Sequence, residues 1–126
     1  MQDKVIYPDL SYRIVGIVFS VFNDLGYGYQ EKYYQRALSV RLREQNIVFK
    51  EQVYCPLMYQ GKKIGSYFFD FLIEDKIVLE LKRADYFSKS AIDQVYAYLK
   101  ARQLQLGIIV IFTSKGVKFK RVLNVY

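Results

Sequence analysis

The stretch that most constrains the fold is "LGIIVIF", residues 106 to 112, in which every side chain is apolar. A run of this kind predicts a strand that is covered on both faces. Ahead of it lie a second apolar run, Ile77 to Lys82, and a serine-rich segment, 88 to 90, that offers an N-cap for a helix from about Ala91 to Gln103. This strand–helix–strand crossover predicts a parallel pair within a mixed sheet.

The rest of the chain supplies further elements around that sheet. In chain order we predict an apolar helix that begins near Pro8 and stops at Gly26, a helix over 30–45, a strand over 47–57 that ends at Cys55-Pro56, a turn at 60–62, a hairpin of strands 64–73 and 77–82, and a last strand over 117–122. The fold class is therefore α/β, one domain over residues 1–126, with a mixed β-sheet flanked by helices around a single modest core.

Composition excludes several classes of protein. No run approaches 18 apolar residues, so we expect no membrane span. Residues 1–4 do not resemble a secretory signal and Cys55 is the only cysteine, which favours a reducing, cytoplasmic location. With no histidine in the chain, Ser-His and Cys-His nucleophiles and imidazole zinc sites are excluded. Catalysis would have to use carboxylates, lysine, tyrosine or a hard metal ion.

Nineteen Lys and Arg against twelve Asp and Glu give a net charge of +7, which favours a polyanionic partner such as nucleic acid. The basic residues predicted to contact it are Arg36, Lys62, Lys63, Arg83 and Lys89, with ordinary solvated faces as the alternative. The 13 tyrosines and nine phenylalanines offer rings for stacking, but in so small a domain we expect most of them in the core.

The hairpin brings two acidic residues together. A three-residue loop centred on Asp75 pairs Asp70 with Glu80 and Phe68 with Lys82, whereas a two-residue loop would shift the register and separate the carboxylates. Opposed like charges between apolar strands are costly, and a divalent cation such as Mg²⁺ would offset that cost. The alternative is a solvated Glu80–Lys82 ion pair with Asp70 at an edge. The trio suits phosphodiester hydrolysis, with Lys82 orienting water or offsetting developing charge.

Two helices add candidate residues to this site. Glu31 shares a helical stripe with Tyr34, Leu38 and Leu42, so its carboxylate needs a partner. If the helix packs on the face that carries the hairpin carboxylates, Glu31 reaches the same metal; otherwise it is a first-turn glutamate favoured by the helix dipole. Gln94 and Tyr98 share a face of the later helix and either contact phosphate or Lys82, or are packing and surface residues.

Three motifs occur in order along the chain: Gly28-x-x-Glu31-x-x-Tyr34, Asp70 followed by Glu80-x-Lys82, and Gln94-x-x-x-Tyr98. Together they resemble the GxxExxY protein family of the PD-(D/E)XK nuclease superfamily, from about Phe19 to Val122. The resemblance implies a restriction-endonuclease-like α-β-β-β-α-β core. Phe69 stands where the superfamily's name has proline, and Ile111-Phe112-Thr113 replaces a frequent Asn-Phe.

The resemblance also implies roles for individual residues. Asp70, Glu80 and the Leu81 carbonyl would be metal ligands, Lys82 the catalytic lysine and Glu31 the acid of the first conserved helix. Gln94 and Tyr98 would form an auxiliary pair near the cleaved phosphate.

The leading hypothesis is a Mg²⁺- or Mn²⁺-dependent nuclease that acts on DNA in preference to RNA. The alternative is an inactive nucleic-acid or protein-binding module, and a purely structural domain would leave the acid pair unexplained. A chain this short would need a homodimer, a partner subunit or relaxed sequence selection.

Overall fold

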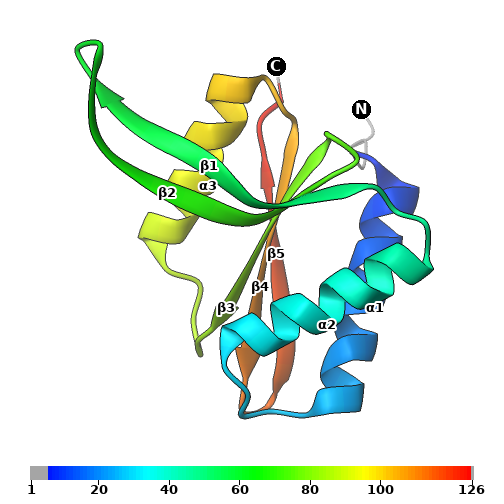
Figure 1. The fold of residues 1–126 in the computed structure, drawn as a ribbon. Coiled ribbons are helices and arrows are strands. Elements are labelled where there is room, and N and C mark those ends of the chain that lie inside the picture. The colour runs from blue at the N-terminus through cyan, green and yellow to red at the C-terminus, as the bar shows by residue number, and fades with distance from the viewer. Residues whose placement is uncertain (1–5, 126) are drawn as a thin grey trace, which may run out of the picture.

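One five-stranded sheet with helices on both faces forms the structure, a computed structural model that describes residues 6–125 (Figure 1). The elements are α1 (Pro8–Leu25), α2 (Glu31–Glu44), β1 (Phe49–Tyr59), β2 (Lys62–Ile73), β3 (Ile77–Arg83), α3 (Lys89–Arg102), β4 (Leu106–Thr113) and β5 (Gly116–Leu123). The predicted order of helices and strands is confirmed. None of the helices in this range combines the length and apolarity needed to cross a bilayer.

The strands follow one another across the sheet in chain order, β1-β2-β3-β4-β5. β3 and β4 are parallel and the other neighbours are antiparallel, which confirms the predicted crossover through α3. Ser88 caps that helix, since its side chain accepts a hydrogen bond from Ala91 N. Every residue of β4 is buried, as its sequence predicts.

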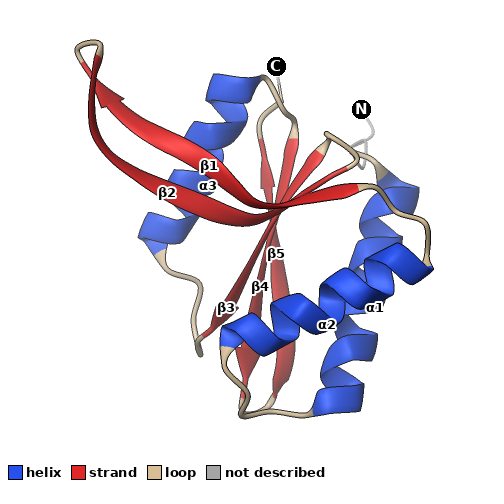
Figure 2. Cartoon of the chain, in the orientation of Figure 1, coloured by secondary structure: helices blue, strands red, loops and turns tan. Residues whose placement is uncertain are grey.

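The expectation of a single core is wrong, because the sheet separates two apolar clusters. Figure 2 shows the strands between α1 and α2 on one side and α3 on the other. α1 and α2 pack on one face around Tyr34, Leu38, Leu79 and Phe112. The opposite face holds a smaller cluster under α3, which includes Cys55, Phe69, Val78, Val95 and Tyr98. A sheet buried on both faces creates two cores by necessity, because side chains alternate between its faces.

The prediction that the first strand ends at Cys55-Pro56 is also wrong. β1 continues to Tyr59, and Pro56 pairs with Ser66 inside it. Proline is tolerated there because β1 is an edge strand and its missing N–H removes no bond from a central ladder. Gln60 and Gly61, both at positive φ, turn the chain into β2.

Beyond Val53 and Phe69 the two strands leave the rest of the sheet as a ribbon, residues 54–68, which we call the arm; Figure 1 shows it projecting from the body. β2 pairs with β3 only through Phe71–Leu79, Leu72–Val78 and Ile73–Ile77. From Asp70 toward the arm, β2 therefore has β1 as its only ladder partner among the described strands.

Most aromatic side chains are not in the core, contrary to expectation. Among residues 6–125, the buried ones are Tyr34, Phe69, Phe71, Tyr98 and Phe112. Exposed rings occur on the helices, on the loops and, in Tyr54, Tyr59 and Phe68, on the arm. An extended arm and a three-layer fold of this size leave too little interior for 22 rings.

Candidate active site

The hairpin register predicted from the loop length is confirmed, because Ile73–Ile77 and Leu72–Val78 pair as expected. The ladder stops one step before Asp70 and Glu80, so the predicted Phe68–Lys82 pairing is absent. Instead, Glu80 Oε1 accepts a hydrogen bond from Asp70 N at 3.0 Å, and Asp70 Oδ2 accepts one from Leu81 N at 2.7 Å. The two carboxylates thus occupy the opening between the strands and satisfy amides that the ladder no longer pairs.

Both carboxyl groups bind protons more tightly than usual. Burial, the charge of Asp70 and a hydrogen bond to its side chain raise the pKa of Glu80 to about 8. Burial also raises the pKa of Asp70, although hydrogen bonds from Glu80 and Leu81 oppose this. Glu80 is only 8% exposed, so the alternative of a solvated ion pair on an open face is wrong for this residue. A buried acid pair of this kind favours either a shared proton or a bound cation.

The metal-free protein is expected to lose stability as pH rises. Because the pKa of Glu80 is about 8 in the folded chain and ordinary in the unfolded chain, the folded state holds the extra proton between about pH 4.5 and 8. The folded state therefore loses stability across that window, with Tm falling by roughly 5–10 °C. Thermal unfolding in EDTA from pH 5 to 8.5 measures this. The isosteric Glu80→Gln variant should flatten the profile, and an equally steep profile in that variant would contradict the assignment.

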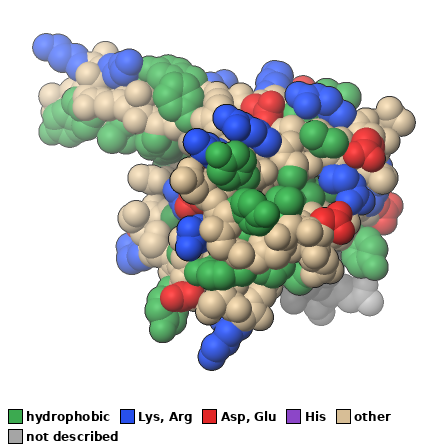
Figure 3. All heavy atoms as spheres, turned by 60° about the horizontal axis from the view of Figure 1, so that its bottom comes forward, with side chains coloured by type: hydrophobic (Ala, Val, Ile, Leu, Met, Phe, Trp, Pro, Cys, Tyr) green, Lys and Arg blue, Asp and Glu red, His purple; other side chains and the backbone are tan. Residues whose placement is uncertain are grey.

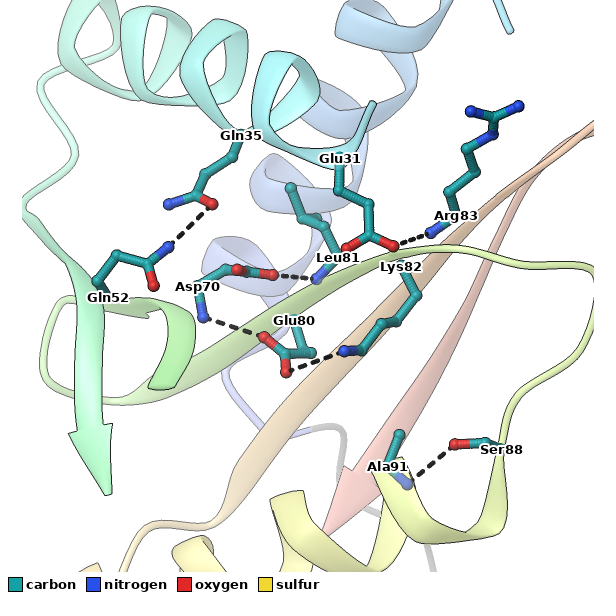
Figure 4. A network of polar contacts seen from close by, with 10 residues as sticks. All are labelled: Glu31, Gln35, Gln52, Asp70, Glu80, Leu81, Lys82, Arg83, Ser88 and Ala91. Atoms are coloured by element: carbon teal, nitrogen blue, oxygen red, sulfur yellow. Dashed lines mark hydrogen bonds and ion pairs between the residues drawn. The ribbon is translucent and has the colours of Figure 1, made fainter. Parts of the chain in front are cut away.

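Lys82 lies beside the pair, with Nζ 3.9 Å from Glu80 Oε2 (Figure 4). Glu80 and Lys82 alternate along β3 with Leu79 and Leu81, which pack under α1 and α2. The Glu80 and Lys82 side chains therefore project toward the α3 face. The condition under which Glu31 was to reach the metal, that α2 packs on this same face, is not met, because α2 packs on the opposite one.

Glu31 reaches the site from that opposite face. It is the first residue of α2 and is exposed, not buried as the stripe suggested, while Tyr34, Leu38 and Leu42 further along the stripe are buried. Its partner is a backbone group, since Glu31 Oε2 accepts a hydrogen bond from Arg83 N at 2.8 Å. The negative charge of Glu31 still contributes to the raised pKa of Asp70. Glu31 and Arg83 also line an open cleft of about 560 Å³, whose lining includes neither Asp70 nor Glu80.

Gln94 and Tyr98 do not behave as a matched pair. Gln94 is exposed on α3, whereas Tyr98 is 3% exposed and packs on Phe69 with ring centroids 4.8 Å apart. Burial raises the pKa of Tyr98, and the groups that modify it are Arg102, Cys55, Lys50 and Asp75. None of these belongs to the acid pair. The structure therefore favours the packing alternative for Tyr98.

The five predicted basic contacts lie on separate parts of the surface. Arg83 flanks the cleft, with its guanidinium over the Tyr27 ring at 5.3 Å, and Arg36 lies over Tyr33 on α2. Lys89 is ion-paired with Asp93 at 2.7 Å. Lys62 and Lys63 lie at the tip of the arm, where Figure 3 shows basic side chains beyond an apolar stretch. Of the five predicted basic contacts, only Arg83 lies next to Glu31.

Two glutamines near the pair were missed from the sequence. Gln52 Nε2 donates to Gln35 Oε1 at 3.0 Å, so β1 is tied to α2 opposite Asp70 (Figure 4). Gln52 has φ 49 and interrupts the β1–β2 pairing at the level of Asp70. Gln35 lies four residues after Glu31, so helical spacing was a signal that could have found it. Nothing in the sequence marks the irregular backbone at Gln52.

The donor set at the pair fits a hard cation held mainly by substrate and water. Among residues 6–125, no three or more carboxylate, cysteine or histidine side chains come together to hold a metal ion. Asp70 and Glu80 each commit one oxygen to an amide and keep the other. Leu81 directs its N–H into the opening, and in a strand the carbonyl of the same residue points the same way. Mg²⁺ commonly binds through one or two carboxylates plus water and phosphate.

Two solved structures share this fold. The crystal structure of SSO0001 is 20% identical with a TM-score of 0.55, over 76% of this chain and 51% of that one. The alkaline exonuclease LHK-Exo from Laribacter hongkongensis is 11% identical with a TM-score of 0.50, over 98% of this chain and 73% of that one. The chain thus spans about half the length of SSO0001. No curated protein matches it.

A family description covers nearly all of the described structure. The sequence model for the PD-(D/E)XK nuclease superfamily matches residues 8–122, from the start of α1 to the end of β5. The opposed Asp70 and Glu80, with Lys82 two residues on, lie where the β2–β3 ladder ends within that match. The chain belongs to the PD-(D/E)XK nuclease superfamily.

Proposed function

We propose that this protein is a metal-dependent nuclease that hydrolyses phosphodiester bonds, with DNA favoured over RNA as substrate. The single observation that carries the proposal is the buried Asp70–Glu80 pair, with the Lys82 ammonium 3.9 Å from Glu80. Two carboxylates forced together at a raised pKa are stabilised by a cation, and the family model that matches the chain is that of a nuclease superfamily.

In this proposal Asp70, Glu80 and the Leu81 carbonyl hold Mg²⁺ or Mn²⁺. A bound divalent cation would polarise a phosphoryl oxygen and lower the pKa of its water ligand. Lys82 orients the attacking water or offsets the charge that develops at phosphorus. Glu31 holds the end of β3 through the Arg83 amide, and its negative charge, which acts on Asp70, would help to hold a bound cation. Gln94 remains a candidate phosphate contact on the exposed side of α3.

The main alternative is an inactive binding module that kept the fold. The intact acid pair argues against it, because a pure binder of nucleic acid gains nothing from buried carboxylates that repel phosphate. The two alternatives also differ in what a divalent ion does: a nuclease needs it for turnover, whereas a binder is indifferent to it.

The test is cleavage of end-labelled single-stranded DNA, duplex DNA and RNA in Mg²⁺, Mn²⁺ or EDTA. Wild type is expected to cut with either ion and not in EDTA, and Glu80→Gln to cut nothing in any condition. Glutamine keeps an oxygen that accepts from Asp70 N, so folding is preserved and the loss reports on the charge. Binding without cutting, unchanged in Glu80→Gln, would establish the binding module instead.

A further inference from the structure

The arm carries an exposed surface that the acid pair does not use. The large apolar side chains exposed on it, each between 41% and 63%, are Tyr54, Leu57, Met58, Tyr59, Ile64 and Phe68. From residue 52 to residue 69 the chain has two lysines and no acidic residue. Figure 3 shows apolar side chains along the projecting ribbon and basic ones at its tip. An apolar patch of this kind on a small domain marks a binding surface.

Tyr54 and Phe68 form the part of this surface closest to the body. They are direct partners across β1 and β2, with ring centroids 5.4 Å apart and planes inclined by 57°. Lys63 Nζ lies 5.3 Å from the Tyr54 centroid. The intervening residues Cys55 and Tyr67 turn toward the α3 cluster, so the Tyr54–Phe68 face contributes no packing there. Two solvent-facing rings with a cation over one of them are suited to stacking and to an anionic backbone.

The position of Phe68 connects this face to the acid pair. Phe68 precedes Asp70 by two residues on β2, which corresponds to about 7 Å between their Cα atoms. The Phe68 ring lies on the face away from the α3 cluster, and Asp70 and Glu80 lie in the opening between β2 and β3. A polynucleotide that places a phosphate at Asp70 from the α2 side therefore has a neighbouring base within reach of the Phe68 ring. The arm then continues toward Lys63 and Lys62 with no acidic residue to repel the backbone and with two lysines at its tip to attract it.

We propose that Tyr54 and Phe68 form a stacking platform for the bases of single-stranded nucleic acid, with Lys63 and Lys62 contacting its backbone. The inference rests on the proposed nuclease function and names its substrate class. Unpaired bases expose faces that an aromatic ring can cover, whereas the bases of a duplex already stack on one another. The arm thus selects single strands and delivers them to the acid pair.

A second copy of this chain fits the arm less well. The net charge is +7 and the arm carries only positive charge, so two arms repel each other. Pro56 lies within the edge strand β1 and has no N–H to donate to an added strand. Charge complementarity therefore favours a polyanion over a homodimer on this surface.

Binding without cleavage tests the platform independently of catalysis. We would titrate a fluorescent single-stranded DNA and its duplex in EDTA with wild type, Tyr54→Ala and Phe68→Ala. Each variant is expected to bind the single strand roughly tenfold more weakly and the duplex almost unchanged. Tyr96→Ala is the matched control, because Tyr96 is 42% exposed against 41% for Tyr54 and also has a lysine over its ring, Lys100 at 5.5 Å. It should bind as wild type.

A spectroscopic variant provides a direct readout of stacking. The chain has no tryptophan, so Phe68→Trp introduces a single indole that can be excited apart from the 13 tyrosines, and its emission should be quenched by a bound single strand. Wild-type affinity in both alanine variants would overturn the platform, as would unquenched emission from a protein with bound strand. A wild-type dimer that Tyr54→Ala and Phe68→Ala dissociate, with single-strand affinity unchanged, would assign the arm to self-association.

The two proposals fail in different ways. If the protein binds single strands through these rings but cuts no substrate, the platform proposal stands and the nuclease proposal fails. If wild type, Tyr54→Ala and Phe68→Ala all cut in Mg²⁺ with equal efficiency, the nuclease proposal stands and the platform proposal fails.

Discussion

Asp70→Asn is expected to reduce metal-dependent cleavage by on the order of 1,000-fold. This is the upper end of the rate losses seen when one group that stabilises charge is removed from an active site. Asparagine retains an oxygen that can accept from Leu81 N and nearly the same volume, so the end of the β2–β3 ladder is preserved. What is lost is the negative charge that would hold the cation. Removing it also relieves repulsion of phosphate, so binding in EDTA should become several-fold tighter.

Single-turnover cleavage and titration in EDTA measure the two effects separately. Asp75→Asn is the matched control, because it makes the same charge change in the exposed turn of the same hairpin, where Asp75 Oδ1 pairs with Lys50 Nζ at 3.3 Å. It should cut and bind as wild type. Cleavage by Asp70→Asn within tenfold of wild type would remove Asp70 from the proposed site.

Tyr34→Ala is expected to lower the free energy of unfolding by about 3–5 kcal/mol, the usual range for deleting a buried aromatic ring. Tyr34 is fully buried, and its ring stacks on Phe112 with centroids 4.2 Å apart. Its hydroxyl donates to the Gly26 carbonyl at the end of α1. The side chain therefore fixes both the inner core and the loop that leads to Glu31. In a domain with a total stability of roughly 5–15 kcal/mol, such a loss is severe.

Urea unfolding of wild type, Tyr34→Ala and Tyr34→Phe separates the ring from the hydroxyl. Phenylalanine keeps the stack on Phe112 and loses the two bonds of the hydroxyl, which donates to the Gly26 carbonyl and accepts from Tyr29 N, so it should cost about 1–2 kcal/mol. Equal losses in the two variants would mean that the hydroxyl, not the ring, carries the stabilisation.

Local rules predicted the register that opposes the two carboxylates. A three-residue loop fixes which residues face each other, and the apolar run of β4 specifies a strand buried on both faces. The Gly28-x-x-Glu31-x-x-Tyr34 spacing likewise has a physical basis in the structure. Gly28 has φ 113, Glu31 begins α2 and Tyr34 anchors the turn into the core.

Tertiary placement is what the sequence could not supply. The stripe of Glu31, Tyr34 and Leu38 predicts that α2 packs on a sheet, but the sheet receives helices on both faces, and helical spacing does not say which face a given helix covers. Packing on the face that bears Glu80 could therefore be stated only as a condition, and the structure does not meet it. The sequence also could not predict where the β2–β3 ladder ends. The ladder ends one step before Asp70, at the level of the irregular β1–β2 pairing at Gln52, and no residue preference marks that irregularity.

Because the β2–β3 ladder is short, different parts of the sheet differ in how easily they open and in how well they tolerate insertions. β4 has a paired strand on each side and is buried throughout, so its amides open only when the whole domain opens. The arm itself makes no ladder pair with β3, because β2 pairs with β3 only over Phe71, Leu72 and Ile73, and the arm ends in an exposed Gln60–Gly61 turn. Insertions at that turn leave both cores untouched. The length of the arm can therefore change in evolution without loss of the fold. The strand that carries Glu80 and Lys82 cannot change as freely, because the stability of the whole domain depends on it.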